Sequence, residues 1–154
     1  MSLETGDKAP AFALPGLAGA TVRLADFKGR KVALFFYPKA NTSLCIAEAQ
    51  DFERLTEAFA EAGTAVVGVS RDPLKAVEKF RDKQNLTLPL ATDEAGGMLE
   101  AYGVWVEKTL YGRRFMGVER ATFLIDAKGR IARIWRKVRV KGHAEEVLAA
   151  ARAL

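Results

Sequence analysis

Two apolar runs in the first half of the chain predict strands that are buried on both faces. The first extends from Lys31 to Phe36 and the second from Thr64 to Val69. Neither run alternates with polar residues, which is typical of central strands in a sheet that helices cover on both sides. The stretch Thr21–Leu24 does alternate and predicts a short strand. The segment before it is rich in proline and glycine, which indicates extended pieces and turns.

Helical periodicity follows each of the two apolar runs. After the first, apolar residues recur on one helical face: Cys45, Phe52, Leu55 and Phe59. We expect this helix to begin near Leu44 and to stop at Gly63. A second helix is predicted to open at Pro73 and to end near Asn85. A short strand over Leu86–Leu90 and a short helix over residues 94–102 are expected next.

The last third of the chain predicts a hairpin and a closing helix. The runs Thr122–Asp126 and Ile131–Trp135 flank a turn in which Gly129 is free to take a positive φ. Gly142 is the expected N-cap of a final amphipathic helix that reaches Leu154. Strands that alternate with helices and then end in a hairpin predict an α/β fold with a mixed β-sheet, in one domain over residues 1–154.

Ligands of such sheets collect at the carboxyl ends of the strands. The loop Tyr37–Leu44 follows the first buried strand at this end, so Cys45 is placed in the first turn of the next helix. A helix N-terminus offers unpaired N–H groups and a positive dipole end, and both favour a thiolate. Cys45 is therefore either a reactive thiol or a buried apolar filler. Thr42 is either a hydrogen-bond donor to the sulfur or the N-cap of the helix.

The residue counts exclude several kinds of site. Cys45 is the only cysteine and His143 the only histidine among 154 residues. An internal disulfide, a CxxC exchange motif and a zinc or iron–sulfur site with several cysteines are therefore excluded. The N-terminal residues lack the features of a signal peptide, and no apolar run is long enough to span a membrane. We expect a cytoplasmic protein that acts away from membranes.

The formal net charge of +5 raises the question of nucleic-acid binding. The basic residues are scattered along the whole chain, and the densest stretch, Arg133–Lys141, does not place them on one face of a strand. A solvated surface is the preferred interpretation, and no nucleic-acid partner is expected.

The segment Pro38–Cys45 fits the Pro-x-x-x-Thr-x-x-Cys signature of peroxiredoxins. Further segments resemble the bacterioferritin comigratory protein (peroxiredoxin Q) group over nearly the full length: Gly6–Pro10, Asp26–Gly29, Phe35–Lys39, Gly68–Asp72, Tyr102–Trp105, Tyr111–Gly112 and Arg120–Asp126. The resemblance implies a thioredoxin-like fold, a central mixed β-sheet flanked by helices with an N-terminal extended or hairpin segment. It also implies thiol-dependent reduction of hydrogen peroxide and organic hydroperoxides, without a cofactor or a metal.

The resemblance assigns roles to four residues. Cys45 is the nucleophile and forms a sulfenic acid, and Thr42 orients the peroxide and the thiolate through its hydroxyl. Pro38 shields the site from water, and Arg120 supplies fixed positive charge beside the sulfur. Prearranged donors of this kind stabilise the charge that moves from sulfur to oxygen. The backbone N–H groups of Leu44 and Cys45 are further candidate donors.

The chain departs from the group around the thiol. Ser43, Leu44 and Ile46 replace the usual neighbours, and they either shape an apolar approach for a peroxide or reductant or reflect drift and core packing. Some relatives carry a second cysteine five residues after the first, where this chain has Gln50, and others carry it in the following helix, near Arg81. The sulfenic acid is therefore expected to react with an external thiol: thioredoxin, glutaredoxin or glutathione. A monomer or weak homodimer is expected, and the alternative function is a redox sensor with little turnover.

Overall fold

The computed structural model describes residues 3–154. The first two residues, which belong to the predicted domain and to the segment tested for a signal peptide, lie outside this range. The strands are β1 (Ala13–Pro15), β2 (Thr21–Arg23), β3 (Lys31–Phe36), β4 (Thr64–Ser70), β5 (Leu90–Thr92), β6 (Trp105–Leu110), β7 (Arg113–Val118), β8 (Ala121–Ile125) and β9 (Ile131–Trp135). The helices are α1 (Ser43–Arg54), α2 (Thr56–Glu61), α3 (Leu74–Gln84), α4 (Gly97–Ala101) and α5 (His143–Ala153), with 3₁₀ turns η1 (Leu17–Gly19) and η2 (Leu24–Phe27).

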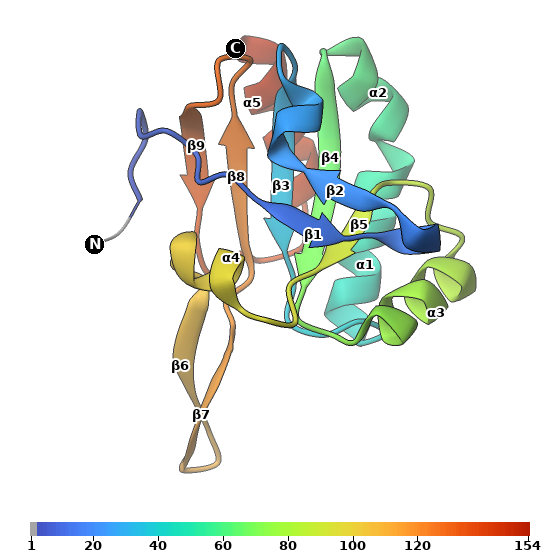
Figure 1. Cartoon of the computed structure of the whole chain (residues 1–154), viewed down its shortest axis with the longest axis vertical. Coiled ribbons are helices and arrows are strands. Elements are labelled where there is room, and N and C mark those ends of the chain that lie inside the picture. The colour runs from blue at the N-terminus through green and yellow to red at the C-terminus, as the bar shows by residue number, and fades with distance from the viewer. Residues whose placement is uncertain (1–2) are drawn as a thin grey trace.

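A five-stranded sheet in the order β5-β4-β3-β8-β9 forms the centre of the molecule (Figure 1). Strands β3, β4 and β5 are parallel, whereas β8 and β9 run antiparallel to their neighbours. The expected mixed sheet with a C-terminal hairpin is therefore confirmed. The N-terminal segment forms its own antiparallel hairpin from β1 and β2, as expected.

The apolar residues of β3 alternate between two hydrophobic clusters, one on each face of the sheet. Ala33 and Phe35 join the cluster that α1, α2, α3 and α5 cover, whereas Val32, Leu34 and Phe36 face the N-terminal segment and α4. Figure 1 shows these two layers in front of and behind the sheet. Burial on both faces explains why the sequence of this strand does not alternate.

Gly68 in β4 lets the helical layer pack closely on the sheet. A Cβ atom at this position would lie 2.7 Å from the Phe35 ring, which is closer than carbon atoms can approach. The Phe35 ring stacks on Phe52 of α1, with centroids 4.6 Å apart. The small residue in β4 thus helps to fix the helix that carries Cys45.

Several predicted boundaries need correction. The predicted helix from Leu44 is interrupted at Leu55, where the backbone leaves the helical region between α1 and α2. The strand expected over Leu86–Leu90 lies instead at Leu90–Thr92, because only this segment reaches the register of β4.

The β6–β7 hairpin was not predicted. It projects from the same end of the sheet at which β3 and β4 end (Figure 1). Most of its side chains are half-buried or exposed, so it lacks the apolar signal of a core strand. Within residues 3–154, we find no helix with the length and apolar character needed to cross a membrane.

Candidate active site

The loop between β3 and α1 is fixed by bonds to the adjacent strand and its following loop. The Tyr37 amide donates to the Val69 carbonyl at 3.1 Å, which extends the β3–β4 pairing by one residue. The Ala40 amide then donates to the Asp72 carboxylate at 2.8 Å. Asn41 takes a positive φ of 62°, a conformation that asparagine tolerates better than most residues. The chain turns there and enters α1.

Cys45 is the third residue of α1, and only 1% of its surface is exposed. The first bond of this helix runs from the Ile46 amide to the Thr42 carbonyl, at 2.8 Å. The amides before Ile46 therefore have no partner within the helix, and their partial positive charges lie in the same first turn as the thiol. The free thiol is placed where the sequence predicted it, at the N-terminus of a helix.

Arg120 reaches this thiol from the position just before β8. Its neighbour Ala121 pairs with Phe36 at the end of β3, so the antiparallel register brings Arg120 beside the loop that precedes α1. The Arg120 Nη2 atom lies 3.3 Å from the Cys45 Sγ atom, and Nη1 donates to Glu48 Oε1 at 2.7 Å. The planar guanidinium thus holds the thiol and a carboxylate in one fixed arrangement.

Glu48 is a charged residue inside the core, with 1% of its surface exposed. Burial raises the pKa of its carboxyl to about 7, although Arg120 acts in the opposite direction. Its Oε2 atom has no hydrogen-bond partner in the part of the chain that the structure describes. The sequence did not mark Glu48 as a candidate site residue. The missed signal was its spacing of three residues from Cys45, on the apolar face of the same helix.

Thr42 occupies the N-cap position, but its side chain does not cap the helix. Its hydroxyl donates to the Lys39 carbonyl at 2.7 Å, so the hydroxyl is tied to the loop rather than to the sulfur. The threonine is exposed, and its oxygen lone pairs remain available as acceptors. Thr42 therefore stands at the N-cap position of α1 without the usual capping hydrogen bond, and its hydroxyl does not donate to the Cys45 sulfur.

Two neighbours of the thiol behave differently from each other. Leu44 leaves 61% of its surface exposed. Ile46 is half-buried and packs against the core, which fits the core-packing interpretation. Of these two residues, only Leu44 is therefore free to make an apolar contact with a ligand.

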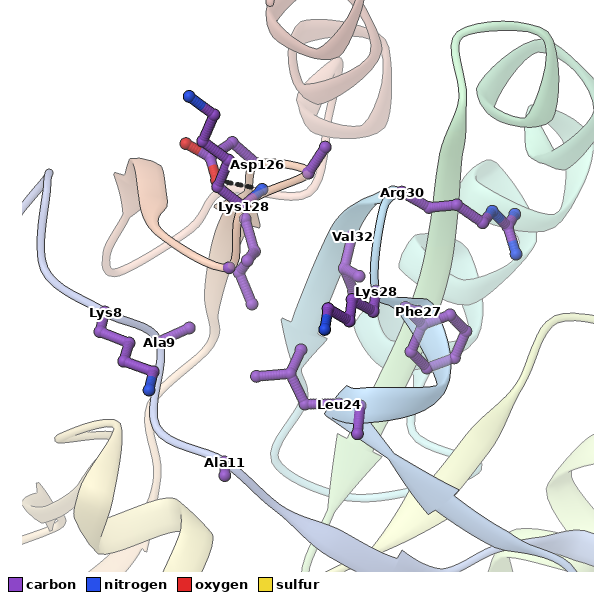
Figure 2. A pocket seen from close by; sticks show the side chains of 14 residues that line it. Lys8, Ala9, Ala11, Leu24, Phe27, Lys28, Arg30, Val32, Asp126 and Lys128 are labelled. Atoms are coloured by element: carbon purple, nitrogen blue, oxygen red, sulfur yellow. Dashed lines mark hydrogen bonds between the residues drawn. The ribbon is translucent and has the colours of Figure 1, made fainter.

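A groove of about 510 Å³ opens beside this loop. Pro38 and Lys39 line one side and the β6–β7 hairpin lines the other. A separate cavity of about 380 Å³ lies at the opposite end of the sheet, between η2 and the β8–β9 turn (Figure 2). Its lining is apart from the loop that precedes Cys45, whereas the groove is lined by Pro38 and Lys39 of that loop.

The model of the AhpC/TSA family matches residues 5–134, which is most of the chain. The chain belongs to this family, and it is a peroxiredoxin, a thiol-dependent peroxidase. Peroxiredoxin Bcp of Bacillus subtilis is 45% identical over 148 residues, which cover 96% of this chain and 94% of the relative. Peroxiredoxin Bcp of Escherichia coli K12 is 37% identical over 146 residues, which cover 95% and 94%.

Solved structures agree with this family. A mutant of PrxQ from Xylella fastidiosa is 36% identical, with a TM-score of 0.94 over 99% of this peroxiredoxin and 98% of the other chain. The bacterioferritin comigratory protein of Xanthomonas campestris, in a study of its alkyl peroxide reduction, is 38% identical, with a TM-score of 0.88 over 92% and 90%. The expected thioredoxin-like fold and the resemblance to the peroxiredoxin Q group are thus confirmed.

Proposed function

We propose that Cys45 is the nucleophile of this peroxiredoxin, within one domain that spans residues 1–154. Its thiolate attacks the terminal oxygen of a hydroperoxide, the O–O bond breaks, and the products are a Cys45 sulfenic acid and an alkoxide or hydroxide. The leaving oxygen then takes a proton from solvent. The observation that carries this proposal is the Arg120 guanidinium, 3.3 Å from the Cys45 Sγ atom at a helix N-terminus.

Arg120 serves two purposes in this step. Its positive charge favours the thiolate, and its N–H groups are in place as negative charge moves from sulfur to oxygen. Since Glu48 holds the other side of the guanidinium, the fork does not have to reorganise during the reaction. Arginine suits this role because it remains protonated.

Thr42 and Pro38 complete the proposed site. The Thr42 hydroxyl donates to the Lys39 carbonyl, which leaves its oxygen to accept a hydrogen bond from the peroxide. Pro38 lines the groove beside the loop, where its ring limits the access of water to the sulfur. The backbone amides of Leu44 and Cys45 supply further donors from the first turn of α1.

Both hydrogen peroxide and organic hydroperoxides are proposed substrates. The relative from Xanthomonas campestris is described with alkyl peroxide reduction activity. In this chain, the exposed Leu44 follows the proposed peroxide-binding loop and offers an apolar surface next to the thiol. An alkyl group gains by covering such a surface.

The sulfenic acid requires a thiol from outside the chain. Cys45 is the single cysteine in the sequence, so no second cysteine stands at Gln50 or near Arg81. Thioredoxin, glutaredoxin or glutathione is the proposed reductant class, and a cytoplasmic monomer or weak homodimer is the proposed working form. A sensor with the same fold would be oxidised once and then stop.

Peroxide consumption over many turnovers separates an enzyme from a sensor. The full chain is mixed with excess peroxide and with glutathione or a thioredoxin system, and Cys45→Ser is the matched control. Consumption far beyond one peroxide per chain, absent in the variant, is the expected result. One equivalent consumed with every reductant would overturn the proposal in favour of a sensor.

A further inference from the structure

The groove beside Pro38 carries an excess of positive charge. Three cationic side chains line it, whereas Asp72 supplies its single carboxylate. One oxygen of this carboxylate already accepts bonds from the Ala40 amide at 2.8 Å and the Ser70 hydroxyl at 2.9 Å. The cationic residues are Lys39, Arg71 and Lys108.

Arg71 is held in a fixed orientation in this groove. Its guanidinium carbon lies 4.3 Å from the centre of the Trp105 ring, and its Nε atom donates to the Glu94 carbonyl at 3.2 Å. Gly96 leaves room for the face of the guanidinium that points away from Trp105, since a Cβ atom at Gly96 would lie 3.4 Å from the guanidinium carbon. We find no hydrogen bond from its two terminal nitrogens within residues 3–154. Two parallel donors of a fixed guanidinium match the two oxygens of a carboxylate.

Lys108 lines the same groove as this guanidinium and supplies a second positive charge. It lies in β6, and its side chain crosses Gly117 in β7, where a Cβ atom would lie 3.2 Å from Lys108 Cδ. Burial and the positive charge of Arg120 lower the pKa of Lys108, and the Cys45 sulfur opposes this change. Lys108 is thus electrostatically coupled to the reacting centre. No ion pair to it is found among residues 3–154.

We propose that this groove binds a small anionic thiol, of which glutathione is the representative, and delivers it to the oxidised Cys45. The carboxylate of the thiol lies against Arg71 and Lys108, and its apolar part covers Trp105 and Met116 at the rim. This inference rests on the proposed one-cysteine cycle, which needs an external thiol. It adds the place at which that thiol binds and the positive side chains that select it.

The chemical steps balance without a further reactant. The bound thiol attacks the sulfur of the Cys45 sulfenic acid, an S–S bond forms, the S–O bond breaks, and water leaves. A second thiol attacks the mixed disulfide and releases Cys45 as a thiol together with the small-molecule disulfide. Two thiols are oxidised, and the two electrons they supply return the sulfenic acid to the thiol.

The binding step is tested without the reaction by using S-methylglutathione, whose sulfur cannot attack. The full chain is titrated with this compound, and the indole N–H of Trp105 is followed by NMR. Saturable shifts are expected, and Lys108→Gln should weaken binding about three- to fivefold, as the loss of one partly exposed charge pair predicts. Lys128→Gln, at the distant cavity of Figure 2, is the matched control and should bind like the parent. Absence of saturable shifts, or equal binding by both variants, would overturn the proposal.

The reaction itself supplies a second readout. The rate constants of glutathione and of neutral 2-mercaptoethanol with peroxide-treated protein are compared per thiolate, so that any general change in Cys45 cancels in their ratio. We expect the rate constant of glutathione divided by that of 2-mercaptoethanol to exceed one. This ratio should fall in Lys108→Gln and in Arg71→Lys, and it should fall with added salt. A ratio that neither variant changes would contradict selection by charge. If no thiol reacts while S-methylglutathione still binds, the proposed catalytic cycle fails and the binding site stands.

Discussion

Arg120 and Cys45 are 75 residues apart in the chain, and the guanidinium Nη2 atom lies 3.3 Å from the cysteine sulfur. The contact depends on the pairing of β3 with β8, which places the start of one strand beside the end of the other. Only 11% of the Arg120 side chain is exposed, so solvent screens this charge weakly. The sheet register therefore determines the electrostatics of the thiol.

Replacement of Arg120 should slow the reaction with peroxide. Arg120→Met removes both the charge and the donors, and a loss of about 10²–10³-fold in the rate constant is expected, as for other transition-state donors. Arg120→Lys keeps the charge but cannot contact Cys45 and Glu48 through one planar fork, so an intermediate rate is expected. Stopped-flow measurement of Cys45 oxidation provides both values. A fully active Met variant would remove Arg120 from the mechanism.

Glu48 should make the stability of the fold depend on pH. Its pKa is about 7 in the folded chain, above the ordinary value of 4.5, because the carboxyl is buried. The folded chain thus binds this proton more tightly than the unfolded chain. Its stabilising contribution is complete below pH 4.5 and is lost as the pH rises through about 7. Relative to Glu48→Gln, the parent should therefore lose stability between about pH 5 and about pH 8.

Urea unfolding of the parent and of Glu48→Gln across this range measures the difference. His143, whose pKa burial lowers to about 4, is present in both proteins, so its own titration cancels in the comparison. Two parallel curves of unfolding free energy against pH would show that Glu48 does not titrate as described.

Thr42 should contribute through its hydroxyl. Thr42→Ser retains the donor to the Lys39 carbonyl and should keep most of the peroxide reactivity. Thr42→Val preserves the shape but removes the hydroxyl, and a loss of about 10²-fold is expected for one transition-state contact. The second-order rate constants of the Thr42→Ser and Thr42→Val variants with hydrogen peroxide measure this difference. Equal rates for Ser and Val would mean that the hydroxyl only shapes the loop.

A cysteine at Gln50 should close the catalytic cycle within the chain. Gln50 is exposed in α1, five residues after Cys45, and its side chain donates to Gln84 at 2.8 Å. Residues at this spacing in a helix lie too far apart for a disulfide, so the first turns of α1 must open before the bond forms. Peroxide should therefore convert Gln50→Cys to an internal disulfide, detected as the loss of both free thiols.

The double variant Gln50→Cys, Cys45→Ser is the control for this experiment and should retain its thiol. A sulfenic acid that persists at Cys45 in the single variant, with the second thiol still free, would show that α1 does not open on the time scale of the reaction.

The sequence predicted most of the elements whose side chains face the core, although it placed the buried strand β5 too early in the chain. The apolar run of β3 and the helical face that carries Cys45 and Phe52 are confirmed because burial leaves a continuous apolar run in the strand and a periodic pattern in the helix. The β6–β7 hairpin left no such pattern, since its side chains are mostly exposed. The sequence did not indicate the groove that contains Arg71, Trp105 and Lys108 either, because polar side chains outside the core leave no apolar pattern.

Among the active-site residues, too, the sequence predicted the position that local patterns determine but not the contacts that depend on long-range pairing. The place of Cys45 in the first turn of α1 followed from local patterns, because a strand, a loop and a helix are consecutive in the chain. The approach of Arg120 required the long-range register of β8, and the sequence indicated it only through a family resemblance. The spacing of Glu48 from Cys45 places it on the same helical face, but its ion pair with Arg120 also depends on the long-range burial of both groups.

The intact mass of the protein after one equivalent of peroxide shows whether Cys45 is the residue that peroxide oxidises. We expect one added oxygen atom per chain, replaced by one glutathione in a mixed disulfide when glutathione is present, and neither adduct in Cys45→Ser. Oxygen or glutathione added to Cys45→Ser to the same extent as to the parent would contradict this expectation, and so would a parent chain that stays unmodified.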